Sequence, residues 1–314
     1  MSNNFIAGID IGGTKIAVAI AIAGGEIIAR DSFRTDHDSP PEDAVSHALM
    51  TLDRMAKASH GQLKAIGLGC PGPLDFERGQ FLAPPNMPAR WHHFPIRSFV
   101  EKKTSLPAVV ENDANAAALG EHLYGAGRGY SDLVYLTIST GIGGGIIADN
   151  KLVHRWCEAG HVMVQPDGNL CGCGARGCLE AMCSGTAIAR RAQSYLQDGR
   201  PSRMSEMVTS ISDVTARTVE DAVRAGDKLA ALVWRETISD MAIGIGSIVA
   251  LLAPQAVILG GGVTAGAGEL LLGPLREELK ERLRIVDQSQ LLAAGLGAES
   301  GLYGTLALSS PAAV

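Results

Sequence analysis

Residues 9–16 have the sequence IDIGGTKI, and residues 138–145 have the sequence ISTGIGGG. Both stretches begin with β-branched apolar residues, which favour a strand. Each then passes through glycines, which favour a tight turn, and continues into a second apolar run. The similarity of the two stretches indicates a duplicated unit. The chain is therefore expected to contain two similar α/β halves, each opening with a strand, a glycine turn and a returning strand.

The pattern around these stretches extends the α/β prediction. In the first half, the predicted strands are residues 4–11, 16–22, 26–33, 63–70 and 108–111. Apolar spacing predicts helices over residues 41–59 and 113–123. In the second half, strands are predicted over residues 133–139, 145–149 and 256–259, and helices over residues 228–252, 270–283 and 298–308. Alternation of strands and helices is typical of an α/β fold, and we expect the two halves to face each other across a cleft.

Length and charge restrict the class of protein. The 314 residues suffice for about two domains. Lys+Arg 27 against Asp+Glu 33 gives a net charge of −6 without a basic cluster, so no nucleic-acid partner is expected. The longest nearly apolar stretch, residues 241–253, is too short to span a membrane, and the N-terminus lacks the basic region of a signal peptide. A cytoplasmic location is expected.

Three glycine turns follow predicted strands, at residues 12–14, 140–143 and 260–262. Glycine lets backbone amides converge on phosphate oxygens, although neither the Rossmann nor the Walker pattern fits these turns. One glycine hairpin alone is most often a plain turn. Two matched hairpins with a third loop indicate a nucleotide instead. Asp10 is an acid in an apolar strand beside the first turn, where the Mg²⁺ of a nucleotide is a suitable partner.

Residues 111–115 (ENDAN) end a predicted strand and open a helix. One interpretation is a helix N-cap, since Asn and Asp are preferred there. That role accounts for one of these polar residues and not for four in succession. Ligand chemistry in α/β sheets usually lies at the carboxyl ends of strands. Asp113 is therefore a candidate catalytic residue.

His161, Cys171, Cys173 and Cys178 provide one imidazole and three thiols, a complete tetrahedral zinc set. Four protein ligands leave no open position, so the predicted zinc is structural. Reduced cysteines without a metal are the alternative. The other cysteines, Cys70, Cys157 and Cys183, are scattered and are expected to be ordinary core or surface residues.

Across nearly its whole length the sequence resembles the ROK family, which comprises repressors and sugar kinases of the actin-like ATPase superfamily. Residues 10–15 and 140–144 are similar to that family's phosphate hairpins, and residues 111–115 to its catalytic segment. Residues 158–161 (EAGH) and 171–180 (CGCGARGCLE) resemble its sugar and zinc motifs, the last being the most specific. The resemblance implies two duplicated ribonuclease-H-like domains, one of residues 1–115 with 299–314 and one of residues 116–298.

By this resemblance Asp113 would be the base of an ATP-dependent hexose kinase acting on a 6-hydroxyl. The implied sugar contacts are Gly72, Asn86, Asn112, Asp113, Glu158, His161 and Glu180. The implied nucleotide contacts are Asp10, Gly12, Gly13, Thr14, Lys15, Thr140, Gly141, Gly143, Gly260, Gly261 and Gly262. The implied cofactors are ATP with Mg²⁺ and a structural Zn²⁺, and the implied assembly is a homodimer or a tetramer.

One departure from the family bears on the substrate. The stretch before the EAGH motif, residues 152–157, is short and lacks glycine, which places Trp156 beside the sugar motif. Glucose is the expected substrate, and N-acetylmannosamine or N-acetylglucosamine is the alternative. A sugar-binding regulator is a more distant alternative. The family's repressors carry a helix-turn-helix domain before the first strand, which here is expected to begin near Asn4.

Overall fold

The first glycine turn, residues 12–14, joins two strands of a five-stranded sheet. The computed structural model describes residues 3–22, 24–154, 157–284 and 289–310. The sheet has the order β3-β2-β1-β4-β7, in which β1, β2 and β3 are antiparallel neighbours and β4 and β7 run parallel to β1. Its strands are β1 (Asn3–Ile11), β2 (Lys15–Ala21), β3 (Ile27–Arg34), β4 (Gly61–Cys70) and β7 (Ala108–Asn112).

The second glycine turn, residues 140–143, belongs to a sheet with the corresponding order, β10-β9-β8-β11-β12. β11 runs parallel to both β8 and β12, and β10 is antiparallel to β9. The strands are β8 (Leu133–Ile138), β9 (Ile142–Ala148), β10 (Lys151–Leu152), β11 (Ala256–Gly260) and β12 (Gln290–Ala293). The matching strand orders confirm the predicted duplication.

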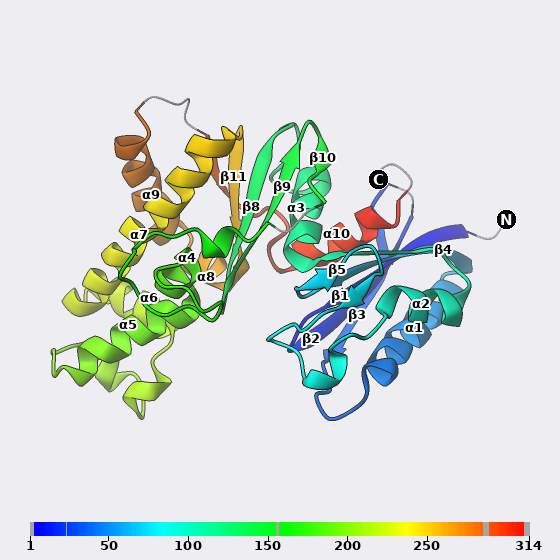
Figure 1. The fold of residues 1–314 in the computed structure, drawn as a ribbon, viewed down its shortest axis with the longest axis horizontal. Coiled ribbons are helices and arrows are strands. Elements are labelled where there is room, and N and C mark those ends of the chain that lie inside the picture. Colours follow the sequence, from blue (N-terminus) through cyan, green and yellow to red (C-terminus); the bar gives the residue numbers. More distant parts are fainter. Residues whose placement is uncertain (1–2, 23, 155–156, 285–288, 311–314) are drawn as a thin grey trace. The chain divides into compact units, whose positions relative to one another are not determined.

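The chain forms two compact units (Figure 1). The first consists of Met1–Ser131, Gly145–Arg155 and Glu299–Val314, and the second of Asp132–Gly144 and Trp156–Ala298. Residues 116–131 and 145–155, expected in the domain of residues 116–298, lie in the first unit. Residues 116–124 belong to it because α3 (Asp113–Tyr124) is one unbroken helix that packs against α10 (Ser300–Leu308).

Glycines allow α3 and α10 to pack closely. A Cβ at Gly304 would lie 1.7 Å from the carbonyl oxygen of Ala116, and one at Gly120 would lie 2.3 Å from that of Ser300. Both distances are impossible for a side chain, so the two backbones touch directly. On the same sheet, α1 (Pro41–Ala58) covers β2 and β4, and α2 (Ile96–Thr104) contacts β7. The short strands β5 (Leu74–Asp75) and β6 (Gln80–Phe81) form a separate hairpin.

The second unit carries most of the helices. They are α4 (Leu179–Cys183), α5 (Gly185–Gln197), α6 (Ala216–Arg224), α7 (Lys228–Leu252), α8 (Gly261–Ala267) and α9 (Glu269–Arg282). α7 has the bounds predicted from its apolar spacing, and its N-cap, Asp227, accepts a hydrogen bond of 2.7 Å from the Ala230 amide. Within the described residues, no helix is both long enough and apolar enough to cross a membrane.

Candidate active site

The first glycine turn is closed by its own backbone. The Gly12 amide donates to the carbonyl of Lys15 at 2.9 Å, so this amide is occupied. The amides of Gly13 and Thr14 make no hydrogen bond within the part of the chain that the structure describes. A Cβ at Gly13 would lie 2.6 Å from the carbonyl oxygen of Asn86, which places the predicted sugar contact Asn86 beside this turn. Two of the three predicted amides are therefore available for a phosphate.

Asp10 is a partly buried carboxylic acid near the end of β1. Burial and, to a smaller extent, the nearby Asp113 carboxylate raise its pKa to about 7, while Lys15 opposes both effects. A Cβ at Gly301 of α10 would lie 2.7 Å from Asp10 Oδ2, so the glycine provides the space that the carboxylate occupies. Two mutually repelling carboxylates in a buried setting favour a cation. This charge arrangement fits the predicted Mg²⁺ partner.

Asp113 is the first residue of α3, and Asn112 is its N-cap. Asn112 Oδ1 accepts hydrogen bonds from the amides of Ala114 at 3.0 Å and Asn115 at 3.3 Å. The capping interpretation of this segment is thus correct for Asn112. Asp113 Oδ1 accepts from the Ala114 amide at 2.8 Å, which fixes its rotamer at the carboxyl end of β7. A Cβ at Gly72 would lie 3.3 Å from Asn112 Nδ2, so the predicted Gly72 also lies at this place.

Glu111 and His154, which have no role in the predicted site, form a pair close in sequence to Asp113 through Glu111. Glu111 is buried, and its Oε1 accepts from the Asn112 amide at 2.8 Å and from Asn115 Nδ2 at 2.9 Å. Its Oε2 lies 2.8 Å from Nδ1 of the half-exposed His154. Glu111 therefore fixes the backbone directly before Asp113. Its position in the ENDAN motif was the available signal, whereas nothing in the sequence pointed to His154.

The second glycine turn lies against Glu180 of α4. Glu180 Oε2 accepts a hydrogen bond from the Ile142 amide at 2.9 Å, and Cys171 Sγ lies 3.9 Å from Glu180 Oε1. A Cβ at Gly141 would lie only 2.5 Å from Glu180 Oε2, so glycine is needed for this approach. Glu180, predicted as a sugar contact, thus also joins the second turn to the cysteine loop.

The predicted metal ligands form one cluster. The ligand atoms of His161, Cys171, Cys173 and Cys178 all lie within 4.8 Å of one another. Cys173 Sγ and Cys178 Sγ are 3.7 Å apart, and Cys171 Sγ is 3.6 Å from His161 Nδ1. A tetrahedral zinc with bonds of about 2.3 Å requires ligand atoms about 3.8 Å apart. The four residues therefore fit a zinc ion.

The remaining nitrogen of His161 points to the sugar motif. His161 Nε2 lies 3.7 Å from Glu158 Oε2, while Nδ1 faces Cys171. Burial raises the pKa of Cys178 to about 12, so a zinc ion held by these residues would have to displace a proton from this thiol. The loop itself depends on Gly177 (φ +68°), where a Cβ would lie 1.4 Å from the Gln165 carbonyl oxygen.

The third glycine segment differs from the expected free turn. Gly260 ends β11, and Gly261 already begins α8 with φ +86°. A Cβ at Gly261 would lie 2.3 Å from the carbonyl oxygen of Ile138, directly before the second turn. The structure thus brings this segment next to the second turn. The predicted Gly143 lies within β9, and Trp156 lies outside the described residues.

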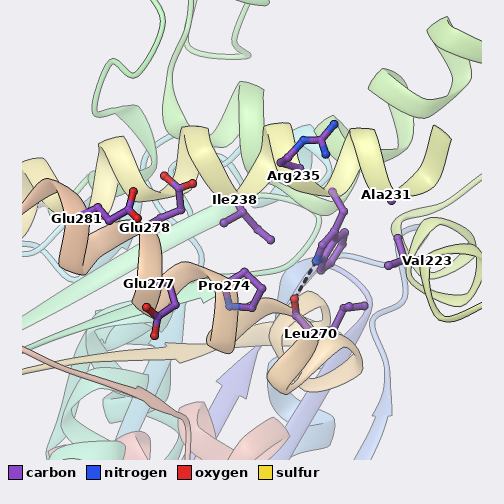
Figure 2. A pocket seen from close by; sticks show the side chains of 10 residues that line it. Val223, Ala231, Arg235, Ile238, Leu270, Pro274, Glu277, Glu278 and Glu281 are labelled. Carbon is purple, nitrogen blue, oxygen red and sulfur yellow. Dashed lines mark hydrogen bonds between the residues drawn. The ribbon is translucent and has the colours of Figure 1, made fainter. Parts of the chain in front are cut away.

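A pocket of about 390 Å³ lies elsewhere in the second unit, between α7 and α9 (Figure 2). Ile238 and Pro274 form part of its apolar wall, and Glu277, Glu278 and Glu281 lie toward one end. Its lining includes none of the predicted site residues. It also lacks a glycine turn, so it does not belong to the candidate active site.

Two α/β units of matching strand order, each with a glycine turn after its first strand, define the actin-like ATPase fold. The ROK family model matches residues 6–311. A glucokinase from Thermotoga maritima is 33% identical over 309 residues, covering 96% of both chains. The chain belongs to the ROK family.

Other relatives differ in the sugar that their names carry. An N-acetylmannosamine kinase from Shigella flexneri is 33% identical over 314 residues, covering 96% of this chain and 97% of the relative. The solved structure of a ROK family glucokinase from Streptomyces griseus, in complex with glucose and AMPPNP, is 36% identical with a TM-score of 0.81. It covers 97% of this chain and 99% of that chain. These similarities extend over both units.

Proposed function

We propose that this protein is an ATP-dependent hexose kinase that phosphorylates the 6-hydroxyl of glucose. The observation that carries the proposal is a pair of acids beside a glycine turn with two available amides. Asp10 is partly buried in β1, and Asp113 is held at the first residue of α3. Asp113 accepts the proton of the attacking hydroxyl. As this proton leaves, the bond from the sugar oxygen to the γ-phosphorus forms and the bond to the β-phosphate oxygen breaks.

The chain's own residues supply binding and charge compensation. The transition state of phosphoryl transfer is loose, so positioning and electrostatic stabilisation dominate catalysis. The Gly13 and Thr14 amides bind phosphate oxygens on the first turn, and the Thr140 and Gly141 amides do so on the second. Asp10 is placed to bind Mg²⁺, which would offset phosphate charge. Lys15, Gly143 and residues 260–262 complete the proposed nucleotide contacts.

Sugar hydroxyls are bound by Gly72, Asn86, Asn112, Asp113, Glu158, His161 and Glu180 in this proposal. A zinc ion on the Cys₃His cluster would fix the tautomer of His161, leaving Nε2 to donate a hydrogen bond. Hydrogen bonds to several hydroxyls reject sugars that lack them. We further propose a cytoplasmic enzyme that assembles as a homodimer or a tetramer.

A second candidate substrate is an N-acetylated hexosamine, because the Shigella flexneri relative matches with similar identity and coverage. A coupled assay of ATP consumption with glucose, mannose, fructose, N-acetylmannosamine and N-acetylglucosamine separates the two. Glucose is expected to give the highest kcat/KM. A higher value for N-acetylmannosamine would replace glucose in the proposal, and no turnover with any hexose would refute the kinase assignment.

A further inference from the structure

Both glycine turns are contacted on one side by a threonine hydroxyl from a neighbouring segment. At the first turn, Thr35 Oγ1 donates to the carbonyl of Gly12 at 2.6 Å. At the second turn, Thr186 Oγ1 donates to the carbonyl of Thr140 at 2.8 Å. Neither threonine belongs to a motif that the sequence analysis singled out. The same contact therefore occurs once in each unit.

Further contacts occupy the remaining carbonyls of the first turn. The Thr35 amide donates to the carbonyl of Thr14 at 3.0 Å, and His37 Nε2 contacts the carbonyl of Gly13. Three successive carbonyls, of residues 12, 13 and 14, thus face the segment that follows β3. Thr35 is buried, with 7% of its surface exposed, and His37 is exposed.

The second turn is held in the same manner. The Gly185 amide donates to the carbonyl of Ser139 at 2.7 Å, and the Ser139 amide donates to that of Gly141 at 2.9 Å. Together with Thr186, these contacts occupy three successive carbonyls. Gly185 and Thr186 form the first turn of α5, so a helix end here replaces the segment after β3.

The geometry of the peptide bond gives these contacts a consequence. In a planar trans peptide, a carbonyl and the N–H of the next residue point in opposite directions. A hydrogen bond to the Gly12 carbonyl therefore directs the Gly13 N–H away from Thr35. A hydrogen bond to the Thr140 carbonyl likewise directs the Gly141 N–H away from Thr186. These are amides to which the proposed function assigns phosphate.

We infer that Thr35 and Thr186 are positioning residues that orient the turn amides for the phosphates of the nucleotide. The inference rests on the proposed function, because it needs the turns to bind phosphate. Neither hydroxyl has to contact the ligand. Each hydroxyl holds the turn amides in the phosphate-binding orientation before the nucleotide binds. This lowers the free-energy cost of ordering the turn on binding.

The test replaces each threonine by valine, which keeps the shape and removes the hydroxyl. Calorimetric titration measures the Kd of AMPPNP, ADP, adenosine and glucose for the whole protein. Thr35→Val and Thr186→Val are each expected to weaken AMPPNP by about 5- to 10-fold, the usual effect of one lost hydrogen bond. Adenosine and glucose should change by less than about 2-fold, because neither ligand carries a phosphate.

Three controls make the outcome specific. Thr35→Ser and Thr186→Ser keep the hydroxyl and should restore AMPPNP affinity. Thr104→Val removes a similar hydroxyl bond to a backbone carbonyl, that of Val100 at 2.8 Å, and should leave AMPPNP affinity unchanged. Thr186 is exposed, so its valine variant tests the inference even where Thr35→Val lowers stability.

The possible results distinguish the positioning role of the threonines from the proposed kinase function. Wild-type affinity for AMPPNP in both valine variants would overturn the positioning role while leaving the kinase proposal intact. An equal loss for AMPPNP, adenosine and glucose would also overturn it, since this indicates a general structural effect. Failure of the wild-type protein to bind AMPPNP would refute both the positioning role and the proposed function.

Discussion

The two glycine turns share their backbone support but differ in the acid that lies beside them. At the first turn, Asp10 is partly buried, lies near Asp113 and has a pKa raised to about 7. At the second turn, Glu180 accepts a hydrogen bond from the turn's own Ile142 amide and approaches Cys171. The charge of Asp10 is therefore only partly compensated, by Lys15, whereas Glu180 already accepts a hydrogen bond from the backbone of its own turn.

This difference indicates that the two copies of the duplicated unit kept the same turn, while the acidic side chains beside the turn took different roles. A phosphate turn needs glycine and fixed carbonyls in both copies, and both copies have them. The first copy adds a pair of acids suited to a cation and a proton acceptor. The second copy connects its turn to the cysteine loop, and through that loop to His161 and Glu158. Substitutions in the two copies should therefore affect the binding of different ligands.

The largest effect is expected at the first turn, from Asp113→Asn. The amide keeps the shape of the carboxylate and its bond to Ala114, but it cannot accept the hydroxyl proton. A general base contributes about 10²–10⁴-fold, so kcat should fall by that factor in a steady-state assay. Glucose affinity, measured by calorimetry, should stay within a few-fold. A kcat equal to that of the wild type would exclude Asp113 as the base.

A second prediction uses the raised pKa of Asp10. Between pH 4 and 7 the folded protein keeps a proton that the unfolded chain has released, so rising pH favours unfolding. From the pKa of about 7 against a normal 3.8, stability should fall by about 3 kcal/mol between pH 5 and pH 8. Urea denaturation at both pH values measures this fall.

The matched control for this prediction is Asp10→Asn, which has the same shape and does not titrate. The difference in unfolding free energy between wild type and variant isolates Asp10 from all other groups. Saturating MgATP should reduce the pH dependence of the wild type, because a cation stabilises the ionised carboxylate. Parallel pH profiles of wild type and variant without ligand would contradict the raised pKa.

Much of this site could be predicted because its residues lie in short local patterns. The ENDAN segment, the two glycine hairpins and the cysteine loop each place their residues through neighbours in sequence. The supporting contacts could not be predicted in the same way. Thr35 is 23 positions from Gly12 and Thr186 is 46 positions from Thr140, so only the fold brings them together.

The fold shows the same division between local and long-range information. The bounds of α7 follow from apolar spacing over 25 residues, and the glycine turns locate β1, β2, β8 and β9. The four-residue strand β12 was missed, since its short sequence, QLLA, has no clear alternation. The expected domain boundary at residue 115 differs from the unit boundary in the structure. The reason is that α3 packs against α10, which follows it far along the sequence, and no local pattern indicates such a contact.

A third prediction compares the turns directly through Gly12→Val and Gly141→Val. A Cβ at Gly12 would lie 3.0 Å from the Lys15 carbonyl, whereas one at Gly141 would lie 2.5 Å from Glu180 Oε2. Overpacking costs about 1–3 kcal/mol, so both variants should lose roughly 10- to 100-fold in AMPPNP affinity. Only Gly141→Val displaces Glu180, so only this variant should also lower the affinity for glucose.

Calorimetry with both ligands tests this comparison, and thermal unfolding serves as the control for folding. Gly273→Val is the control, because Gly273 lies in α9 outside the proposed site and a Cβ there would lie 3.7 Å from Glu269 Oε2, an ordinary contact distance. Equal losses of glucose affinity in Gly12→Val and Gly141→Val would show that the turns do not differ as described. Unchanged AMPPNP affinity in either variant would remove that turn from nucleotide binding.

The smallest effect is expected from loss of the metal, which acts on the sugar only through the second unit's loop. Metal analysis should find one zinc per chain, and Cys173→Ala should lower that content. His161 would then lose its fixed orientation, and Glu180 would lose the neighbouring Cys171 loop as a support. Changes around metal ligands typically cost 10–100-fold. Since His161 is one of several proposed sugar contacts, we expect a rise of about 10-fold in the glucose KM and a smaller fall in kcat.

The split between ligands distinguishes this role from a purely structural one. AMPPNP affinity should change little in Cys173→Ala, because the second turn keeps its bonds to Gly185 and Thr186. Cys183→Ala is the control, since Cys183 is a buried cysteine outside the cluster whose thiol contacts the Thr237 carbonyl. A zinc-free protein with full activity would contradict the metal site. An unchanged glucose KM in zinc-depleted protein would instead show that the metal only stabilises the cysteine loop. The second turn would then have no connection to sugar binding through that loop.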